Sequence, residues 1–384
     1  MTPASAQSGE LAWCEDELFA LENKALRRAP VTLSSARGPE VTIAGRPVLA
    51  FCSNDYLGLA TDPRVRGAAA EAAGRWGAGS GASRLVSGTT ELHLEVEEAL
   101  AGLKGCEQAL LFSSGYLANI GVIPALVGRE DAVFSDEANH ASIIDGCRLS
   151  GARVSVYRHA EVSDLDRRLR ATPARRRLVV TDTVFSMDGD LAPLAELADL
   201  CQEHGVMLMV DEAHATGVLG LTGAGAVEAA GVTGRVSIVM GTLSKALGAA
   251  GGFVAGRAEV IEMLRNRARS YIFDTAPGAA ALGATLEALR IVASEPERRA
   301  RVLEVARTLF EGLGGLGLRV GRPSAAIVPL LVGEAAEAAA LSARLLERGI
   351  LVPAIRPPSV PPGTARLRIT AMATHTREHL ERVW

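Results

Sequence analysis

Short, uninterrupted apolar segments recur along the first three quarters of the chain, and helical patterns lie between them. Continuous apolar runs are typical of strands that are covered on both faces. Alternation of strand and helix favours a mainly parallel sheet with right-handed crossover connections. We therefore expect a seven-stranded sheet with helices on both faces. Its predicted strands are 109–112, 132–134, 154–157, 178–181, 207–210, 236–240 and 253–255.

The pattern changes after about residue 285, where long helices rich in Ala, Leu, Glu and Arg alternate with fewer strands. This change predicts an α/β fold with a smaller C-terminal α/β domain at 286–384, a large domain at 51–285 and an N-terminal helix and extended segment at 1–50. The predicted helices include 13–28, 92–103, 192–204, 296–313 and 335–348. The predicted C-terminal strands are 326–332, 351–355 and 365–370.

The composition excludes several classes of protein. A net charge of −4 gives no electrostatic reason to expect nucleic acid or an anionic membrane as a partner. The five cysteines are far apart and form no Cys-x-x-Cys, so we expect neither a disulfide framework nor a metal site. Their spacing favours a reducing compartment. Residues 1–10 lack the pattern of a leader, and no uncharged apolar run reaches the roughly 20 residues that span a bilayer. A cytoplasmic location is the resulting expectation.

Lysine is rare in this chain. Of its forty lysine and arginine residues, only Lys24, Lys104 and Lys245 are lysines. Lys245 lies between an apolar run that ends at Met240 and a glycine-rich run that begins at Gly248. Arginine stays protonated, whereas a lysine amine can lose its proton near neutral pH and attack a carbonyl carbon. A solvated lysine is the ordinary alternative, but this apolar, glycine-rich context fits it poorly.

Two predicted strand ends offer groups that suit an anion. Gly115 opens a helix directly after a strand, so backbone N–H groups can approach an anion at the positive end of that helix. Thr242 and Ser244 can add hydroxyl groups. The glycine alone is a weak signal, because many strand-to-helix turns carry glycine for geometry, and the Gly-Lys-Ser/Thr of a Walker-type loop is absent.

Asp211 follows an apolar run directly and is therefore expected at the carboxyl edge of the sheet, where open α/β sheets bind ligands. A buried carboxylate is costly unless a cation meets it. The alternatives are a turn cap, or half of a metal site with His214, for which no completing group is found. Asp211 and Lys245 on successive strand ends fit pyridoxal phosphate, since the lysine forms an imine and the aspartate pairs with the ring nitrogen. His140, at another strand-to-helix junction, can stack on the ring.

The chain resembles the α-oxoamine synthase family of fold-type-I pyridoxal-phosphate enzymes from about residue 20 to its C-terminus. The resemblance implies a homodimer and a decarboxylative acyl transfer to an amino acid. Segment 354–368 is most similar to the family member that condenses L-alanine with a pimeloyl thioester in biotin synthesis. Segment 139–146 is also similar to the glycine-using member that forms 2-amino-3-oxobutyrate. The motifs that carry the resemblance are 53–59 (SNDYLGL), 81–88 (GASRLVSG), 138–142 (ANHAS), 184–190 (VFSMDGD), 211–214 (DEAH) and 242–245 (TLSK).

The resemblance implies a role for each cofactor residue. Lys245 would anchor the cofactor and then remove the α-proton of the amino acid, and Asp211 would pair with the ring nitrogen. His214 would hydrogen-bond the ring oxygen, and His140 would stack on the ring and face the substrate. The remaining cofactor residues would be Gly115, Tyr116, Ser186 and Thr242, with Thr275 reaching the phosphate across the dimer interface.

The resemblance also implies the substrate residues. Arg368 would bind the amino-acid carboxylate, and Asn54 would lie at the reacting centre. Arg27 and Ser359 would face the acyl substrate, with Arg28 as the alternative to Arg27 and Ser359 standing where the family has threonine. Coenzyme A and acyl carrier protein both remain candidates for the thioester carrier. A nucleotide-binding dehydrogenase or a non-enzymatic binding protein is the competing class, and it leaves Lys245 unexplained.

Overall fold

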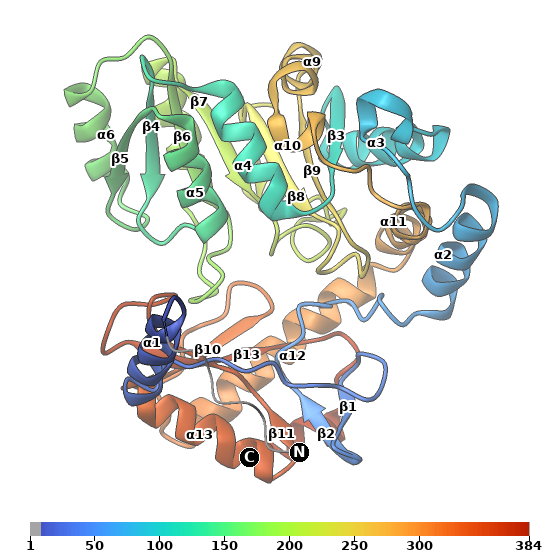
Figure 1. Ribbon diagram of the computed structural model, residues 1–384, viewed down its shortest axis with the longest axis vertical. Helices are drawn as coiled ribbons and strands as arrows, with labels where there is room; N and C mark the ends of the chain where they lie inside the picture. The colour runs from blue at the N-terminus through green and yellow to red at the C-terminus, as the bar shows by residue number, and fades with distance from the viewer. Residues whose placement is uncertain (1–8, 384) are drawn as a thin grey trace.

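The computed structural model describes residues 9–383 (Figure 1). Residues 1–8 and 384 lie outside the described residues. They include most of the stretch 1–10, in which a leader was not expected, and the ends of the segments 1–50 and 286–384. The helices are α1 Ala12–Asn23, α2 Pro63–Trp76, α3 Glu91–Lys104, α4 Gly115–Leu126, α5 Ala141–Ser150, α6 Val162–Ala171, α7 Leu194–His204, α8 Ala226–Ala229, α9 Ala258–Arg267, α10 Arg269–Ile272, α11 Ala279–Ser294, α12 Pro296–Gly315, α13 Ala335–Glu347 and α14 Arg377–Glu381. The strands are β1 Glu40–Ile43, β2 Arg46–Ala50, β3 Gln108–Phe112, β4 Ala132–Asp136, β5 Arg153–Tyr157, β6 Arg177–Asp182, β7 Met207–Asp211, β8 Ile238–Thr242, β9 Gly252–Gly256, β10 Ile327–Gly333, β11 Ile350–Leu351, β12 Ala354–Ile355 and β13 Ala365–Thr370.

The large sheet confirms the predicted fold class. Within the described residues it has seven strands in the order β3-β9-β8-β7-β6-β4-β5. The pairs from β8 to β5 are all parallel, and β9 runs antiparallel to both of its neighbours, β3 and β8. Figure 1 shows these strands in the upper half of the view, from β5 on the left to β3 on the right.

Helices cover both faces of this sheet, as continuous apolar strands require. Along β3, Leu110 and Phe112 pack into one buried cluster with side chains from α4, α5, α9 and α10. Ala109 and Leu111 point the other way and pack into a second cluster with side chains from α3, α6 and α7. Because successive residues of a strand alternate between faces, a single apolar run supplies both clusters.

Two smaller three-stranded sheets, β1-β2-β11 and β10-β13-β12, lie below the large one in Figure 1, beside α12 and α13. β11 pairs in parallel with β2, so the N-terminal hairpin and a C-terminal segment share one sheet. The division of the chain at residues 50 and 285 remains a prediction, and residue 285 lies inside α11. No helix among the described residues is long and apolar enough to cross a bilayer.

Three predicted elements differ from the observed ones. The first helix ends at Asn23 rather than at residue 28, and Ala25 adopts a positive φ of 52° that a helix does not allow. The strand predicted at 236–240 lies at 238–242, because its partner β9 ends at Gly256, which pairs with Ile238. The strand predicted at 351–355 is divided into β11 and β12, and Pro353, which has no N–H to donate, stands between them.

Candidate active site

The predicted cofactor residues meet at the carboxyl ends of β7 and β8. Asp211 is the last residue of β7 and pairs with Met240 of the parallel strand β8, so Lys245, three residues beyond β8, lies at the same edge. A cavity of about 210 Å³ opens there. Its lining comprises Ser114, Gly115, Tyr116, His140, Ser142, Asp182, Asp211, Ala213, His214, Met240, Thr242, Ser244 and Lys245.

The amine of Lys245 is held at one side of this cavity. Its Nζ lies 2.9 Å from Nε2 of His214, whose Nδ1 lies 2.6 Å from the hydroxyl of Tyr56. Burial lowers the pKa of Lys245, the charge of Asp211 partly opposes this and the charge of Arg368 adds to it, and the net pKa is about 8. Burial also holds the pKa of His214 well below its usual range, so His214 is neutral and can accept a hydrogen bond from the amine.

The carboxylate of Asp211 is oriented by two donors. The side-chain amide of Asn119 in α4 donates to it at 2.8 Å, and the backbone N–H of Ala213 donates to its other oxygen at 2.8 Å. A second carboxyl group, Asp182, lies at the end of β6 and accepts from the backbone N–H of His140 at 2.7 Å. Burial and the neighbouring charge of Asp211 raise the pKa of Asp182 well above its usual range.

The opposite end of the cavity suits an anion. α4 begins at Gly115, so the first backbone N–H groups of this helix precede the intrahelical hydrogen-bond ladder, and Ser114 caps the helix by accepting from Leu117 at 3.1 Å. A Cβ atom on Gly115 would lie 3.0 Å from Cε of Met240 and 3.5 Å from Cβ of Thr242, so a side chain there would fill the cradle. The hydroxyls of Thr242 and Ser244 lie 2.8 Å apart beside it.

This donor set fits pyridoxal phosphate. The cofactor has an aldehyde, a ring nitrogen that can be protonated, and a phosphate. The structure supplies one group for each of them: a lysine amine of lowered pKa, a buried and oriented carboxylate, and a glycine-opened helix N-terminus flanked by hydroxyls. His140 lines the same cavity and is free to face a ring within it.

Arg368 joins the small domain to this site. It lies in β13, and its Nε donates to the carbonyl oxygen of Ser186 at 2.5 Å. Its Nη1 donates to Oδ1 of Asn54 at 3.0 Å, and its Nη2 lies 3.5 Å from the hydroxyl of Tyr56. Since Tyr56 in turn contacts His214, a continuous set of hydrogen bonds runs from Arg368 to Lys245.

Other predicted residues lie outside the lining of this cavity within the described chain. Ser186 contributes its carbonyl oxygen to Arg368, and the carbonyl oxygen of Thr275 accepts from Ser113 at 2.8 Å. The guanidinium of Arg27 is 57 % exposed and pairs with Glu22.

The chain segments that carry Arg27 and Ser359 do meet. Arg356 donates to the carbonyl oxygens of Ala25 and Arg27, and Nη2 of Arg28 donates to the carbonyl oxygen of Pro357 at 3.3 Å. The two expected acyl-substrate residues therefore belong to neighbouring loops, although 332 positions separate them in the sequence.

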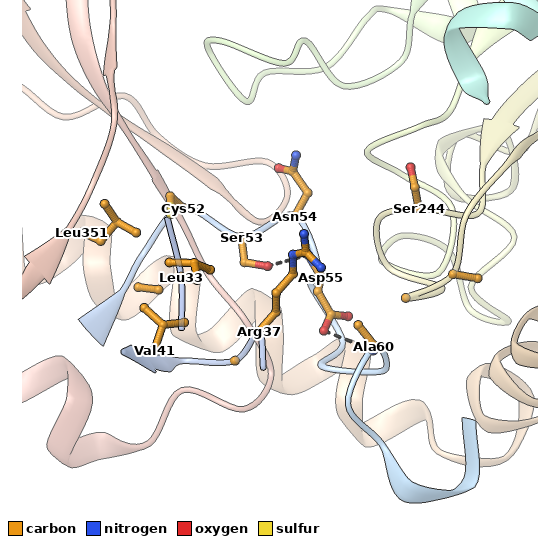
Figure 2. Close-up of a pocket in the computed structure, with 14 residues that line it drawn as sticks. Leu33, Arg37, Val41, Cys52, Ser53, Asn54, Asp55, Ala60, Ser244 and Leu351 are labelled. Carbon is orange, nitrogen blue, oxygen red and sulfur yellow. Dashed lines mark hydrogen bonds between the residues drawn. The ribbon is translucent and has the colours of Figure 1, made fainter. Parts of the chain in front are cut away.

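A larger cavity of about 510 Å³ adjoins the lysine cavity, and Ser244 lines both (Figure 2). Figure 2 shows Leu33 and Leu351 on one side of it and Ser244 on the other, with Arg37 extending between them. Asp55 lies in its wall and accepts from the backbone N–H groups of residues 59 and 60, and burial raises the pKa of Asp55 to about 6.

Three site residues were not predicted from the sequence as ligands or as their supports. Asn119 is a completely buried amide in the otherwise apolar helix α4, and that contrast is the signal that marks it. Tyr56 belongs to the motif from which only Asn54 was selected, and its role depends on contacts with residues 158 and 312 positions away. Asp182 ends an apolar run in the same way as Asp211, so the same rule would have found it.

Comparison with known proteins agrees with this geometry. Residues 46–384 match the model of the family described as aminotransferase class I and II. The 8-amino-7-oxononanoate synthase of Anaeromyxobacter sp. (strain Fw109-5) is 60% identical over 95% of this chain and 92% of its own length. The synthase of the same name from Geobacter sulfurreducens is 52% identical over 95% of this chain and 94% of its own length.

Solved structures extend the likeness to the fold. A serine palmitoyltransferase from Sphingomonas wittichii superposes with a TM-score of 0.92 at 35% identity, over 99% of this chain and 96% of that protein. The 8-amino-7-oxononanoate synthase of Francisella tularensis superposes with a TM-score of 0.77 at 29% identity, over 87% of this chain and 95% of that protein. A serine palmitoyltransferase from S. paucimobilis, solved with a bound adduct of pyridoxal phosphate and myriocin, gives a TM-score of 0.91 at 35% identity, over 97% of this chain and 95% of that protein.

Proposed function

Since the chain belongs to the aminotransferase class I and II family, we propose that it catalyses the decarboxylative condensation of L-alanine with a pimeloyl thioester, which yields 8-amino-7-oxononanoate for biotin biosynthesis. Relatives that carry the name of this synthase are 51–60% identical over nearly the whole chain. The serine palmitoyltransferases share the fold at 35–36% identity. The higher identity therefore favours the alanine-using activity over the serine-using one.

One observation carries the proposal: a lysine amine of lowered pKa and an oriented aspartate share a cavity that ends at a helix N-terminus. Pyridoxal phosphate, when bound, supplies an aldehyde carbon and an electron-withdrawing ring. A pKa of about 8 leaves part of the Lys245 population neutral near neutral pH, so its amine can attack a carbonyl and can later accept the α-proton of the amino acid. The Asp211 carboxylate, held by Asn119 and the N–H of Ala213, would favour a proton on the ring nitrogen of the bound cofactor.

The remaining residues bind and orient. Arg368 offers its guanidinium to the carboxylate of alanine, and Asn54, already bonded to Arg368, lies beside the reacting carbon. His140 would cover one face of the ring, and His214 would hydrogen-bond its oxygen. Gly115, Tyr116 and Thr242 line the cavity that would hold the cofactor. Ser186, which lies outside that lining, would act through its carbonyl oxygen on Arg368. Arg27, or its neighbour Arg28, and Ser359 meet the acyl substrate from their adjoining loops.

A second copy of the chain completes the proposal, because Thr275 is assigned to the phosphate of the partner's site in a homodimer. A cytoplasmic location remains a prediction from the dispersed cysteines.

A substrate panel tests the proposed reaction. Purified enzyme loaded with pyridoxal phosphate is given alanine, glycine or serine together with acetyl or pimeloyl thioesters of coenzyme A and of acyl carrier protein. Release of thiol and of CO₂ is measured, and the product is identified by mass. We expect turnover with alanine and a pimeloyl thioester, and none with the Lys245→Ala control. Preferred use of glycine with acetyl thioester would reassign the chain to the 2-amino-3-oxobutyrate-forming activity.

A further inference from the structure

Lys104 is a second lysine that the chain keeps in its interior. It is the last residue of α3, and its side chain is 2% exposed. Its Nζ forms an ion pair with the carboxylate of Glu212, which is itself 0% exposed, and donates to the hydroxyl of Thr216 at 2.8 Å and to the carbonyl oxygen of Ala224. The aromatic ring of Phe253 lies 5.7 Å from the same atom, measured to the ring centre.

These contacts explain why a lysine stands here in a chain rich in arginine. A lysine ammonium is compact and has three N–H donors, and three acceptors surround this one. An arginine would place a planar fork of five donors in a space that offers three acceptors on different sides, and two of its donors would be buried without partners. The site is thus specific for the shape of an ammonium group as well as for its charge.

Glu212 is held as firmly as Lys104. Its carboxylate also accepts from the backbone N–H of Val227 at 2.7 Å. Gly225 lies against it, because a Cβ atom there would come within 2.1 Å of Oε2 of Glu212. Every neighbour of this carboxylate therefore keeps it in one position.

The segment that Lys104 ties together carries the groups that face the cofactor cavity. The backbone N–H groups of Ala215 and Thr216 donate to the carbonyl oxygen of Glu212 at 3.0 and 2.9 Å, so residues 212–216 form a turn. The first and last residues of this turn both bind Nζ of Lys104. Between them lie Ala213, whose N–H orients Asp211, and His214, which contacts the amine of Lys245.

We propose that Lys104 is a positioning residue that fixes both ends of the turn 212–216 and so holds the Asp211 carboxylate and the His214 ring toward the cofactor cavity. It touches neither substrate nor cofactor and acts through the turn. The role rests on the proposed function, because it matters for catalysis only if Asp211 and Lys245 serve pyridoxal phosphate.

Two variants separate this role from a contribution to stability alone. Lys104→Met leaves the Glu212 charge buried without its cation, and we expect its Tm to fall by about 5 °C or more. The double variant Lys104→Met with Glu212→Gln removes that charge and keeps an acceptor for Val227, so its Tm should return to within about 2 °C of the wild type. In the double variant, residue 104 still cannot bind residues 212 and 216, so the two ends of the turn are no longer joined.

The readouts are the affinity for pyridoxal phosphate, followed by visible absorbance, and the pH midpoint for chemical labelling of Lys245 in protein freed of cofactor. We expect the double variant to bind the cofactor about tenfold more weakly, which is the loss of about one charge-assisted contact. Its labelling midpoint should fall by about half a pH unit or more, because a displaced Asp211 no longer favours the charged amine.

Thr216→Val keeps both charges and removes one acceptor, and it should weaken cofactor binding about threefold in the same direction. Arg176→Met is the matched control. It breaks an ion pair with the buried Asp131 next to the start of β4, at the edge of the sheet opposite the site, and should lower the Tm without moving either readout.

A double variant with a recovered Tm, wild-type cofactor affinity and an unmoved labelling midpoint would overturn the proposal, as would wild-type values in Thr216→Val if the double variant does not fold. Failure of the proposed function looks different. In that case the wild-type protein itself either binds no pyridoxal phosphate or prefers another pair of substrates in the panel, while the labelling midpoint still reports whether Lys104 positions Asp211.

Discussion

Two substitutions should move the pKa of Lys245 in opposite directions. This pKa falls from 10.5 to about 8 as the net result of three effects: burial lowers it, the negative charge of Asp211 raises it, and the positive charge of Arg368 lowers it. Arg368→Met removes a neighbouring cation, so the protonated amine becomes easier to form and the pKa rises. Asp211→Asn removes the anion that favours protonation, so the pKa falls. A pair of changes with opposite signs tests the electrostatics more sharply than either change alone.

The size of the effect follows from the titration curve. At about pH 7.5, an amine of pKa about 8 is neutral in roughly a quarter of molecules, whereas an amine at the ordinary 10.5 is neutral in roughly one molecule in a thousand. Lys245 should therefore react about two hundred times faster than an ordinary lysine at that pH, for equal access. At that pH, a rise of about half a unit to one unit in Arg368→Met lowers the neutral fraction about threefold to eightfold. An equal fall in Asp211→Asn raises it only about twofold to threefold, because the fraction cannot exceed one.

The assay measures the neutral amine directly and needs no turnover. Protein freed of cofactor is treated briefly with an acylating reagent between about pH 6 and about pH 11, and the labelled peptides are quantified by mass spectrometry. The peptide with Lys24, which is exposed at the end of α1, serves as the internal standard for the reagent. Circular dichroism at each pH confirms that both variants stay folded.

Two outcomes would refute the reasoning. A wild-type midpoint above about pH 10 would mean that burial does not lower the pKa of Lys245. Shifts of the same sign in Arg368→Met and Asp211→Asn would mean that the two charges do not act on the amine through space. In either case the amine would lack the partly neutral population on which its proposed double use depends.

Three further substitutions address other parts of the molecule. Lys245→Ala should abolish turnover and the absorbance of the imine between the lysine and the cofactor, and borohydride should then trap no cofactor on the protein; retained activity would contradict the assignment. His159 bridges Asp136 and Asp190 at 3.0 and 2.7 Å, and these side-chain bonds raise its pKa to about 10. This stabilisation is complete below the unfolded pKa of about 6.5 and is lost as the pH rises through about 10. In urea titrations, His159→Gln should therefore lower the free energy of unfolding by about 2 kcal/mol at pH 7. The free energy of unfolding of the variant should also decline less steeply between pH 7 and pH 10 than that of the wild type. Gly248 has a φ of 63°, and a Cβ there would lie 2.3 Å from the backbone nitrogen of Ala60. Gly248→Ala should therefore lower the free energy of unfolding by about 2 kcal/mol or more in urea titrations and, by displacing the loop after Lys245, weaken cofactor binding. An unchanged urea midpoint would show that the loop accommodates the added methyl group.

Local patterns predicted the large sheet and its catalytic edge because both depend on short stretches of chain. Each buried strand is visible as an apolar run, and the residue just beyond the run lies at the carboxyl edge, which identifies Asp211. Lys245 is identified by the rarity of lysine and by the apolar and glycine-rich runs on either side of it. The order of the strands was beyond this kind of reasoning. β9 lies between β3 and β8, and its pairing with β3 joins segments that are more than a hundred residues apart.

The supports of the site were harder to predict than the site. Lys104 at the end of a charged helix has the pattern of a solvated cation that favours a helix C-terminus, and its burial follows only from the packing of α3 against the turn after β7. Arg27 shows the reverse difficulty. The resemblance selects its position, but the guanidinium of Arg27 forms an exposed ion pair with Glu22, a local contact that no motif predicts.

The hydrogen-bonded path from Arg368 to Lys245 has a consequence for synthesis on the ribosome. The amine and its aspartate emerge well before Arg368, which lies 123 positions after Lys245 in the sequence. A nascent chain can therefore complete the large sheet and expose a reactive lysine while the guanidinium that neighbours it is still untranslated. Asn54 and Tyr56, which are translated early, also lack their hydrogen-bond partner until Arg368 is made. A chain truncated before Arg368 should consequently keep a lysine that reacts with aldehydes but lack the guanidinium that binds the carboxylate of an amino acid.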